Sequence, residues 1–154
     1  MKYFLFILIV CNSQLINAEN ELMMDPIHIK ISQNPDWIKN TSEVFDIGFQ
    51  CGDLFYLSAK HLKYLNYDDE DLIKKLDYYS EFFTQSTFSF VENKLLWKDE
   101  ILDFMIDQTR ILYKNEIRTK FSKTDGQFNG LIKKDMRACL GIIHLFESLP
   151  QKIT

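Results

Sequence analysis

The sequence predicts an all-α protein, a small bundle of about four helices in a single domain at residues 41–150. Only five Gly and three Pro punctuate the 154 residues, which favours long helices over many short strands. Apolar residues also recur every three or four positions in four separate stretches. The 13 Phe, seven Tyr and two Trp supply a large aromatic core for such a bundle.

Residues 1–18 are expected to be a cleaved signal peptide. Lys2 supplies the positive start, residues 3–10 are an unbroken apolar run, and Ala18 offers a small-residue cleavage point. A run of about eight residues is too short to cross a bilayer, which takes roughly 20. A lipoprotein signal ending at Cys11 is the alternative, although bulky Val10 precedes that cysteine. We therefore expect an exported protein with no transmembrane segment, periplasmic if bacterial and secreted if eukaryotic.

Residues 19–40 show no sustained helical period and are expected to form a loosely docked N-terminal arm. Within them Ile27, Ile29 and Ile31 alternate with polar residues in the manner of a short strand. The arm ends where the first strongly periodic stretch begins.

The first helix is predicted over residues 41–65. Asn40 followed by Glu43 resembles a capping arrangement, and Asn40 also begins a formal Asn-Thr-Ser glycosylation acceptor. Its apolar stripe is Val44, Ile47, Cys51, Leu54, Ser58, Leu62 and Leu65, widened by Phe45, Phe49 and Tyr56. Because this surface is so wide, we expect the helix to be central and buried on more than one side.

The second helix is predicted over residues 69–93, with an interruption near Ser86 and Thr87. Four consecutive acids, residues 68–71, open it. They lack the alternating ligands and central Gly of a calcium loop, whereas acids at a helix start interact favourably with the helix dipole. We interpret them as a capping cluster.

Two further helices complete the predicted bundle. The third follows Asp99 and Glu100, and it carries Lys114, Arg118 and Lys120 towards its end, which fits the helix dipole. A polar turn at residues 122–126 precedes the fourth, which ends before Pro150. The stripe of the fourth helix is Phe128, Ile132, Met136, Cys139, Ile143 and Phe146.

Cleavage of the leader leaves two cysteines, Cys51 and Cys139, in an oxidising compartment. Both lie on apolar stripes, so packing the first helix on the last brings the sulfurs together and predicts one disulfide. Two separately buried thiols are the alternative. Gly48, Gly52 and Gly141 lie within helices near these cysteines, which is either incidental or permits close helix approach.

No catalytic residue, metal site or cofactor site is predicted, and we expect no enzyme. His28, His61 and His144 have no metal-ligand spacing, and no Ser lies in a nucleophile-elbow context. Loss of Lys2 leaves 17 basic and 22 acidic residues, a net charge of −5. This mild acidity argues against a nucleic-acid partner, which needs clustered Lys and Arg.

The segment Cys139-Leu140-Gly141-Ile142-Ile143-His144 resembles the Cys-Leu-x-x-x-His segment near the end of the type VI secretion amidase-immunity family. The placement of residues 46–51 before Ala59 and Lys60 is similar too. The resemblance implies an exported helical protein, bridged by its two cysteines, that binds and blocks a peptidoglycan-cleaving amidase. Leu145 and Phe146 stand where that family has a small polar residue.

Three functions follow as hypotheses. The first is an exported, non-enzymatic interaction protein, specifically a periplasmic immunity inhibitor of an amidase toxin. The second is a secreted carrier of a hydrophobic ligand, whose pocket would be lined by Tyr78, Tyr79, Phe82, Phe83, Phe88 and Phe90. The third is a hydrolase of unfamiliar design.

Overall fold

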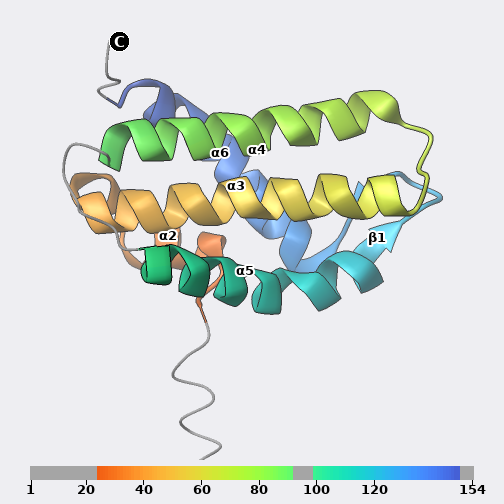
Figure 1. Ribbon diagram of the computed structural model, residues 1–154, viewed down its shortest axis with the longest axis horizontal. Coiled ribbons are helices and arrows are strands. Elements are labelled where there is room, and N and C mark those ends of the chain that lie inside the picture. Colours follow the sequence, from red (N-terminus) through yellow and green to blue (C-terminus); the bar gives the residue numbers. More distant parts are fainter. Residues whose placement is uncertain (1–23, 92–98, 150–154) are drawn as a thin grey trace, which may run out of the picture.

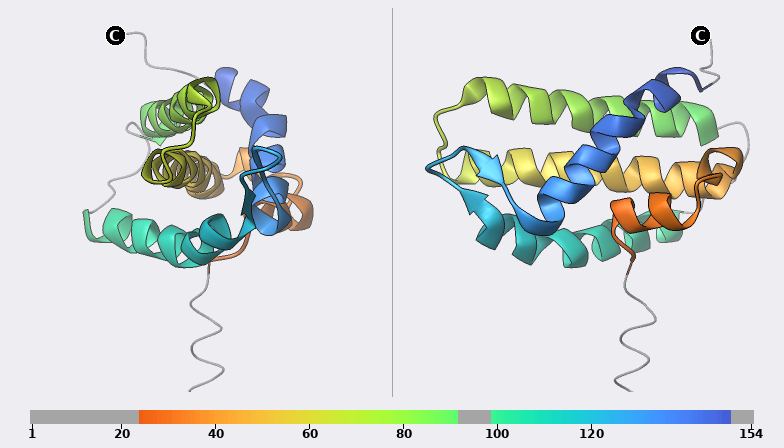
Figure 2. Two further views of the ribbon diagram at one scale, coloured as in Figure 1. Left: turned by 90° about the vertical axis from the view of Figure 1, so that its right-hand side faces the viewer. Right: turned by 180° about the vertical axis from the view of Figure 1, so that it is seen from behind.

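The computed structural model describes residues 24–91 and 99–149, which form an all-α bundle with one small hairpin. The main helices are α3 (Thr41–Tyr64), α4 (Glu70–Val91), α5 (Asp99–Lys120) and α6 (Gly130–Glu147). In Figure 1, α3 lies between α4 and α5, and α6 runs behind them. Figure 2 shows α6 crossing the back of α3 obliquely. The predicted signal peptide and cleavage point lie outside the described residues.

Helix α3 is the central element, as predicted, and it contacts α4, α5, α6 and the segment before it. Its side chains are buried on several sides of the helix; Phe45, Leu54 and Leu62, for example, are fully buried. Each such side chain contributes about 1.5–3 kcal/mol by leaving water. The position of α3 therefore organises the hydrophobic core.

The helix starts confirm part of the capping predictions. The side chain of Asn40 accepts a hydrogen bond from the Ser42 backbone N–H at 3.0 Å and caps α3. Glu43 does not complete a capping box, because its carboxylate accepts from Asn34 instead. At the start of α4, Asp69 accepts from the Leu72 backbone N–H at 2.8 Å.

The structure differs from the predicted arm over its described part. Residues Ile27–Gln33 form helix α2, not a strand, and Trp37–Lys39 form the short 3-10 helix η1. Ile27 and Ile31 lie four positions apart and pack on the core, with Ile27 at 0% exposure. The same isoleucines fit both periods, and contact with α6 selects the helix. The arm is therefore docked, not loose, from residue 24 onward.

A hairpin also replaces the predicted start of the last helix. Strand β1 (Phe121–Ser122) pairs antiparallel with β2 (Gln127–Phe128), so the predicted polar turn lies between two strands. Phe128 packs on Phe121 within this hairpin and precedes α6, which begins at Gly130. Helix α4 shows no interruption at Ser86 or Thr87.

The predicted disulfide between Cys51 and Cys139 is present and joins α3 to α6, the first and last of the four main helices. The two Cα atoms are 5.8 Å apart and both residues are fully buried. Only Gly48 and Gly52 permit close approach: added Cβ atoms would lie 2.1 Å from Thr87 Oγ1 and 2.7 Å from Thr84 Oγ1. Gly141 has open space around it, so its presence is not explained by packing.

Within residues 24–91 and 99–149, no helix combines the length and the apolar character needed to cross a bilayer.

Candidate functional site

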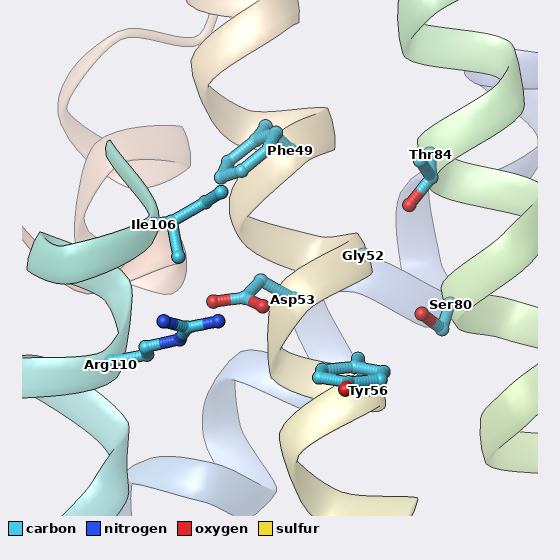
Figure 3. Close-up of a pocket in the computed structure, with 8 residues that line it drawn as sticks. All are labelled: Phe49, Gly52, Asp53, Tyr56, Ser80, Thr84, Ile106 and Arg110. Atoms are coloured by element: carbon cyan, nitrogen blue, oxygen red, sulfur yellow. The ribbon is translucent and has the colours of Figure 1, made fainter. Parts of the chain in front are cut away.

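Two adjoining pockets lie where α3 meets α5, and we call this surface the α3–α5 face. The smaller one, the Asp53 pocket, has a volume of about 200 Å³ and receives side chains from α3, α4 and α5 (Figure 3). Its lining residues are Phe49, Gly52, Asp53, Tyr56, Ser80, Thr84, Ile106 and Arg110. Gly52 forms its inner wall because α4 approaches α3 closely there.

Asp53 is the unusual group in this pocket. Its Oδ2 atom is buried and has no hydrogen-bond partner among the described residues. Burial raises the pKa of the carboxyl to about 6, against the opposing influence of the positive charges on Arg110 and Lys60. Perturbed carboxyls in pockets are candidates for functional groups.

Arg110 reaches from α5 towards Asp53, and Figure 3 shows the guanidinium and the carboxylate pointing toward one another. They form no ion pair within 4.0 Å; the described partner of Arg110 is Asp107, at 4.0 Å. The pocket thus presents Asp53 Oδ2, a buried acceptor without a partner among the described residues, opposite the guanidinium donors of Arg110. Ser80 and Thr84 project from α4 on the other side of Gly52 and make no hydrogen bond to Asp53.

The larger pocket, which we call the basic groove, has a volume of about 710 Å³ and continues from the first, since Arg110 lines both. Its lining residues are Leu57, Lys60, His61, Tyr64, Arg110, Lys114, Ile117 and Arg118. No carboxylate is among them. Arg110, Lys114 and Arg118 follow one another at four-residue spacing and so share one face of α5.

Three of the four Lys and Arg side chains that line the groove lack an ion-pair partner among the described residues; the fourth, Arg110, lies 4.0 Å from Asp107. Across the described parts of the chain, Lys60, Lys114 and Arg118 take part in no ion pair. Lys60 lies 5.6 Å from the centre of the Tyr56 ring, a cation–π contact. Burial lowers the pKa of His61, and the charges of Arg118 and Lys123 lower it further. His61 is therefore neutral at pH 7.

A second polar cluster, away from this face, surrounds Asp135, whose two carboxylate oxygens both accept hydrogen bonds; within it Gln50 Oε1 has no hydrogen-bond partner among the described residues. Asp135 on α6 is 0% exposed and accepts hydrogen bonds from the Tyr113 hydroxyl at 2.6 Å and the His28 backbone N–H at 2.9 Å. The His28 ring contacts the same carboxylate. Gln50 donates to the Tyr113 hydroxyl at 3.1 Å. The cluster ties α2, α3, α5 and α6 together.

Tyr113 stays protonated in this cluster. Burial raises the pKa of its hydroxyl well above the ordinary value, and the charge of Asp135 and the hydrogen bond to it raise it further. The hydroxyl is therefore a permanent donor to Asp135. We interpret the cluster as structural.

The residues singled out in the sequence are distributed across the molecule. The His28 ring contacts the Asp135 carboxylate, and His61 lines the basic groove. Lys114 and Arg118, which were expected only to complement the helix dipole, line the same groove. Within the part of the chain that the structure describes, no three His, Cys, Asp or Glu side chains are grouped to hold a metal ion.

Sequence reasoning missed Asp53, Arg110 and Asp135. One signal was present: Asp53 lies four residues after Phe49 and three before Tyr56, and Asp135 lies between Ile132 and Cys139. An acid within an apolar helical stripe is either paired or functional.

The aromatic cluster proposed for a carrier does not line either pocket. Phe83 is fully buried and packs on Phe55 and Phe146, while Tyr78 is 62% exposed on the outside of α4. Some of these rings therefore belong to the hydrophobic core and others lie on the protein surface, and none of them lines the two pockets.

No protein-family model, curated protein or solved structure matches this chain.

Proposed function

We propose that this chain is an exported, non-enzymatic binding protein whose basic groove receives an acidic segment of a partner protein. The observation that carries the proposal is the gathering of Lys60, Lys114 and Arg118 in a groove that no carboxylate lines. This occurs in a chain whose net charge is −4. Like charges held together are unfavourable until an anion joins them.

Other surface cations contrast with those of the groove. Lys63 pairs with Asp77 at 2.8 Å, Lys74 with Glu70 at 3.3 Å, and Lys39 with its neighbour Asp36. A carboxylate placed 4 Å from a groove cation would gain about 1 kcal/mol in water and about 4 kcal/mol in a less polar surface site. Several such pairs would supply specificity and fast association.

The groove also offers apolar contact. Tyr64 is 83% exposed at its rim, and Leu57 and Ile117 line it. Tyr and Arg dominate the energetics of many protein interfaces because they combine a large contact area with a polar group. A partner segment that alternates acidic and apolar residues fits this lining.

The compartment and the partner class remain part of the proposal. The fully buried Cys51–Cys139 disulfide supports an oxidising compartment and hence export. The resemblance of residues 139–144 to the amidase-immunity family makes a peptidoglycan-cleaving amidase the first partner to test. The net charge of −4 repels a polyanion at long range, which favours a protein segment with a few acidic residues over a nucleic acid.

The test is affinity capture from the protein's own compartment, with mass spectrometry of what stays bound. Three baits are compared: the unchanged protein, Lys114→Glu/Arg118→Glu, and the control Lys134→Glu/Arg137→Glu. The control residues are exposed on α6, and both double variants change the net charge equally.

A protein held by the unchanged and control baits and lost from the groove variant supports the proposal, and an amidase as that protein supports the inhibitor. Equal capture by all three baits, or no stoichiometric protein with any of them, overturns it.

A further inference from the structure

The Asp53 pocket pairs one unsatisfied acceptor with one set of donors. Asp53 Oδ2 is buried without a hydrogen bond among the described residues, and the Arg110 guanidinium faces the carboxylate without reaching it. A group that lies between them must donate to Asp53 and accept from Arg110. Hydroxyls and carboxamides do both, and a carboxamide does so with two separate atoms.

The charges around the pocket exclude simple ions. A cation that approached Asp53 would be repelled by Arg110 and Lys60, the two positive groups that act on this carboxyl. An anion that approached Arg110 would leave the buried carboxylate unsatisfied beside a second negative charge. A neutral ligand meets neither penalty.

The size and the walls of the pocket suit one short side chain. Its volume of about 200 Å³ is comparable with cavities of about 150 Å³ that hold a benzene molecule. Phe49 and Ile106 form an apolar wall, against which the methylene groups of a Gln side chain would pack.

We infer that the Asp53 pocket receives the carboxamide of an Asn or Gln from the same partner segment that occupies the basic groove. This inference rests on the proposed function. The two pockets share Arg110, so one ligand can fill both.

The helix geometry gives the spacing of that partner segment. Asp53 and Lys60 are seven residues apart on α3, or about 10 Å along the axis at about 1.5 Å per residue. An extended chain covers this distance in about three residues at about 3.3 Å each. The segment therefore carries an Asn or Gln about three positions from its first acidic residue.

The test is a nuclear magnetic resonance titration of the mature, oxidised protein with three probes of equal size: propionamide, propionate and propylammonium. We expect propionamide to shift the backbone amides of Gly52 and Asp53 and the Arg110 side-chain N–H more than either ion does. Asp53→Leu, which keeps a similar shape without the acceptor, removes the shifts.

Arg110→Met provides a second variant because Arg110 is half exposed and its loss disturbs the core little. It should also abolish the preference for propionamide. A larger shift with either ion, no shift with any probe, or an unchanged response in both variants overturns the inference. No shift with any probe would mean that the pocket holds only water, and an unchanged response in both variants would mean that propionamide binds elsewhere.

The titration needs no partner, so its result does not depend on the result of the capture experiment. If propionamide binds but the groove variant still captures the partner, the proposed function is contradicted, and so is the assignment of the pocket to a partner segment. If Lys114→Glu/Arg118→Glu loses the partner but propionamide does not bind, only the carboxamide inference is contradicted. If both the proposed function and the carboxamide inference hold, Asp53→Leu should lower the affinity for the captured partner about tenfold.

Discussion

Two acidic residues within apolar stripes have opposite surroundings. Asp135 accepts from Tyr113 and His28 and is satisfied by the fold itself. Asp53 has no hydrogen-bond partner for its buried oxygen in the described residues. A buried carboxylate without partners lowers the stability of the folded state, and such a cost is typical of a site that is completed by a ligand.

The cost of Asp53 predicts how stability depends on pH. Folding raises the pKa from 3.8 to about 6, so the folded state binds the proton more tightly. The penalty is present above pH 6 and disappears as the pH falls below about 4. Asp53→Asn should therefore increase the free energy of unfolding at pH 7 by at most about 3 kcal/mol, and very little at pH 4. Urea unfolding at both pH values measures this, and an equal effect at both would contradict it.

The opposite result is expected at Tyr113. Tyr113→Phe removes the hydroxyl that donates to Asp135 at 2.6 Å and accepts from Gln50 at 3.1 Å. Two buried polar groups then lose a partner, which should lower the free energy of unfolding by about 1–3 kcal/mol. Tyr78→Phe, at an exposed ring, is the control and should change it by less than about 0.5 kcal/mol. Thermal unfolding that shows similar effects for the two variants would disprove the structural role of the cluster.

Helix α3 is positioned by contacts that differ on each side. On one side Gly48 and Gly52 admit Thr87 and Thr84 of α4, and on another the disulfide holds α6. Two pockets lie where α3 meets α5, and residues of α4 also line the smaller one. The Asp53 pocket therefore borders the close Gly52–Thr84 contact on one side, while the basic groove is lined by α3 and α5 alone.

Two glycines on neighbouring helices should respond in opposite directions to Ala. At Gly48 an added Cβ would lie 2.1 Å from Thr87 Oγ1 and 2.6 Å from the Phe146 ring, so Gly48→Ala should destabilise the protein by about 1–3 kcal/mol or more. At Gly141 no atom lies within 4 Å, so Gly141→Ala should stabilise it by about 0.5–1 kcal/mol through helix propensity. Calorimetric melting temperatures test both, and a gain at Gly48 would show that α3 and α4 are not packed this closely.

The four main helices were predictable because each carries a long apolar period, and Asn40 and Asp69 also cap the starts of α3 and α4. Helix α2 was not, since Ile27 and Ile31 satisfy the helical and the alternating pattern alike, and only contact with α6 decides between them. The hairpin was missed for a similar reason: Phe128 matches the stripe of α6 but pairs with Phe121. Short elements are decided by tertiary contacts, which a local pattern does not contain.

At the scale of the whole molecule, the disulfide fixes how α6 lies across α3. It closes a sequence separation of 88 residues, which corresponds to about 4–5 kcal/mol in the chain-entropy treatment. The packing of α5 on α3 places Lys60 of α3 in one groove with Lys114 and Arg118 of α5. More than 50 residues separate these cations in the sequence, so their meeting was not predictable without the fold.

Removal of the bridge should therefore cost much of the stability of the domain. Cys51→Ala/Cys139→Ala should lower the melting temperature strongly, because both the loop constraint and two buried contacts are lost. Reduction of the unchanged protein should have a similar effect, whereas the double variant should be insensitive to reductant. Equal melting temperatures for the oxidised protein and the variant would mean that the bridge contributes nothing to stability.

The charges of the α3–α5 face determine, in this account, which protein is bound. The measurement that tests this most directly is the dissociation constant of the captured partner for the unchanged protein, Lys114→Glu/Arg118→Glu and Lys134→Glu/Arg137→Glu. We predict that reversal in the groove weakens binding by roughly hundredfold or more, and that the α6 control stays within about threefold. Equal losses in the two variants, or none in either, would contradict the assignment of the basic groove as the binding site.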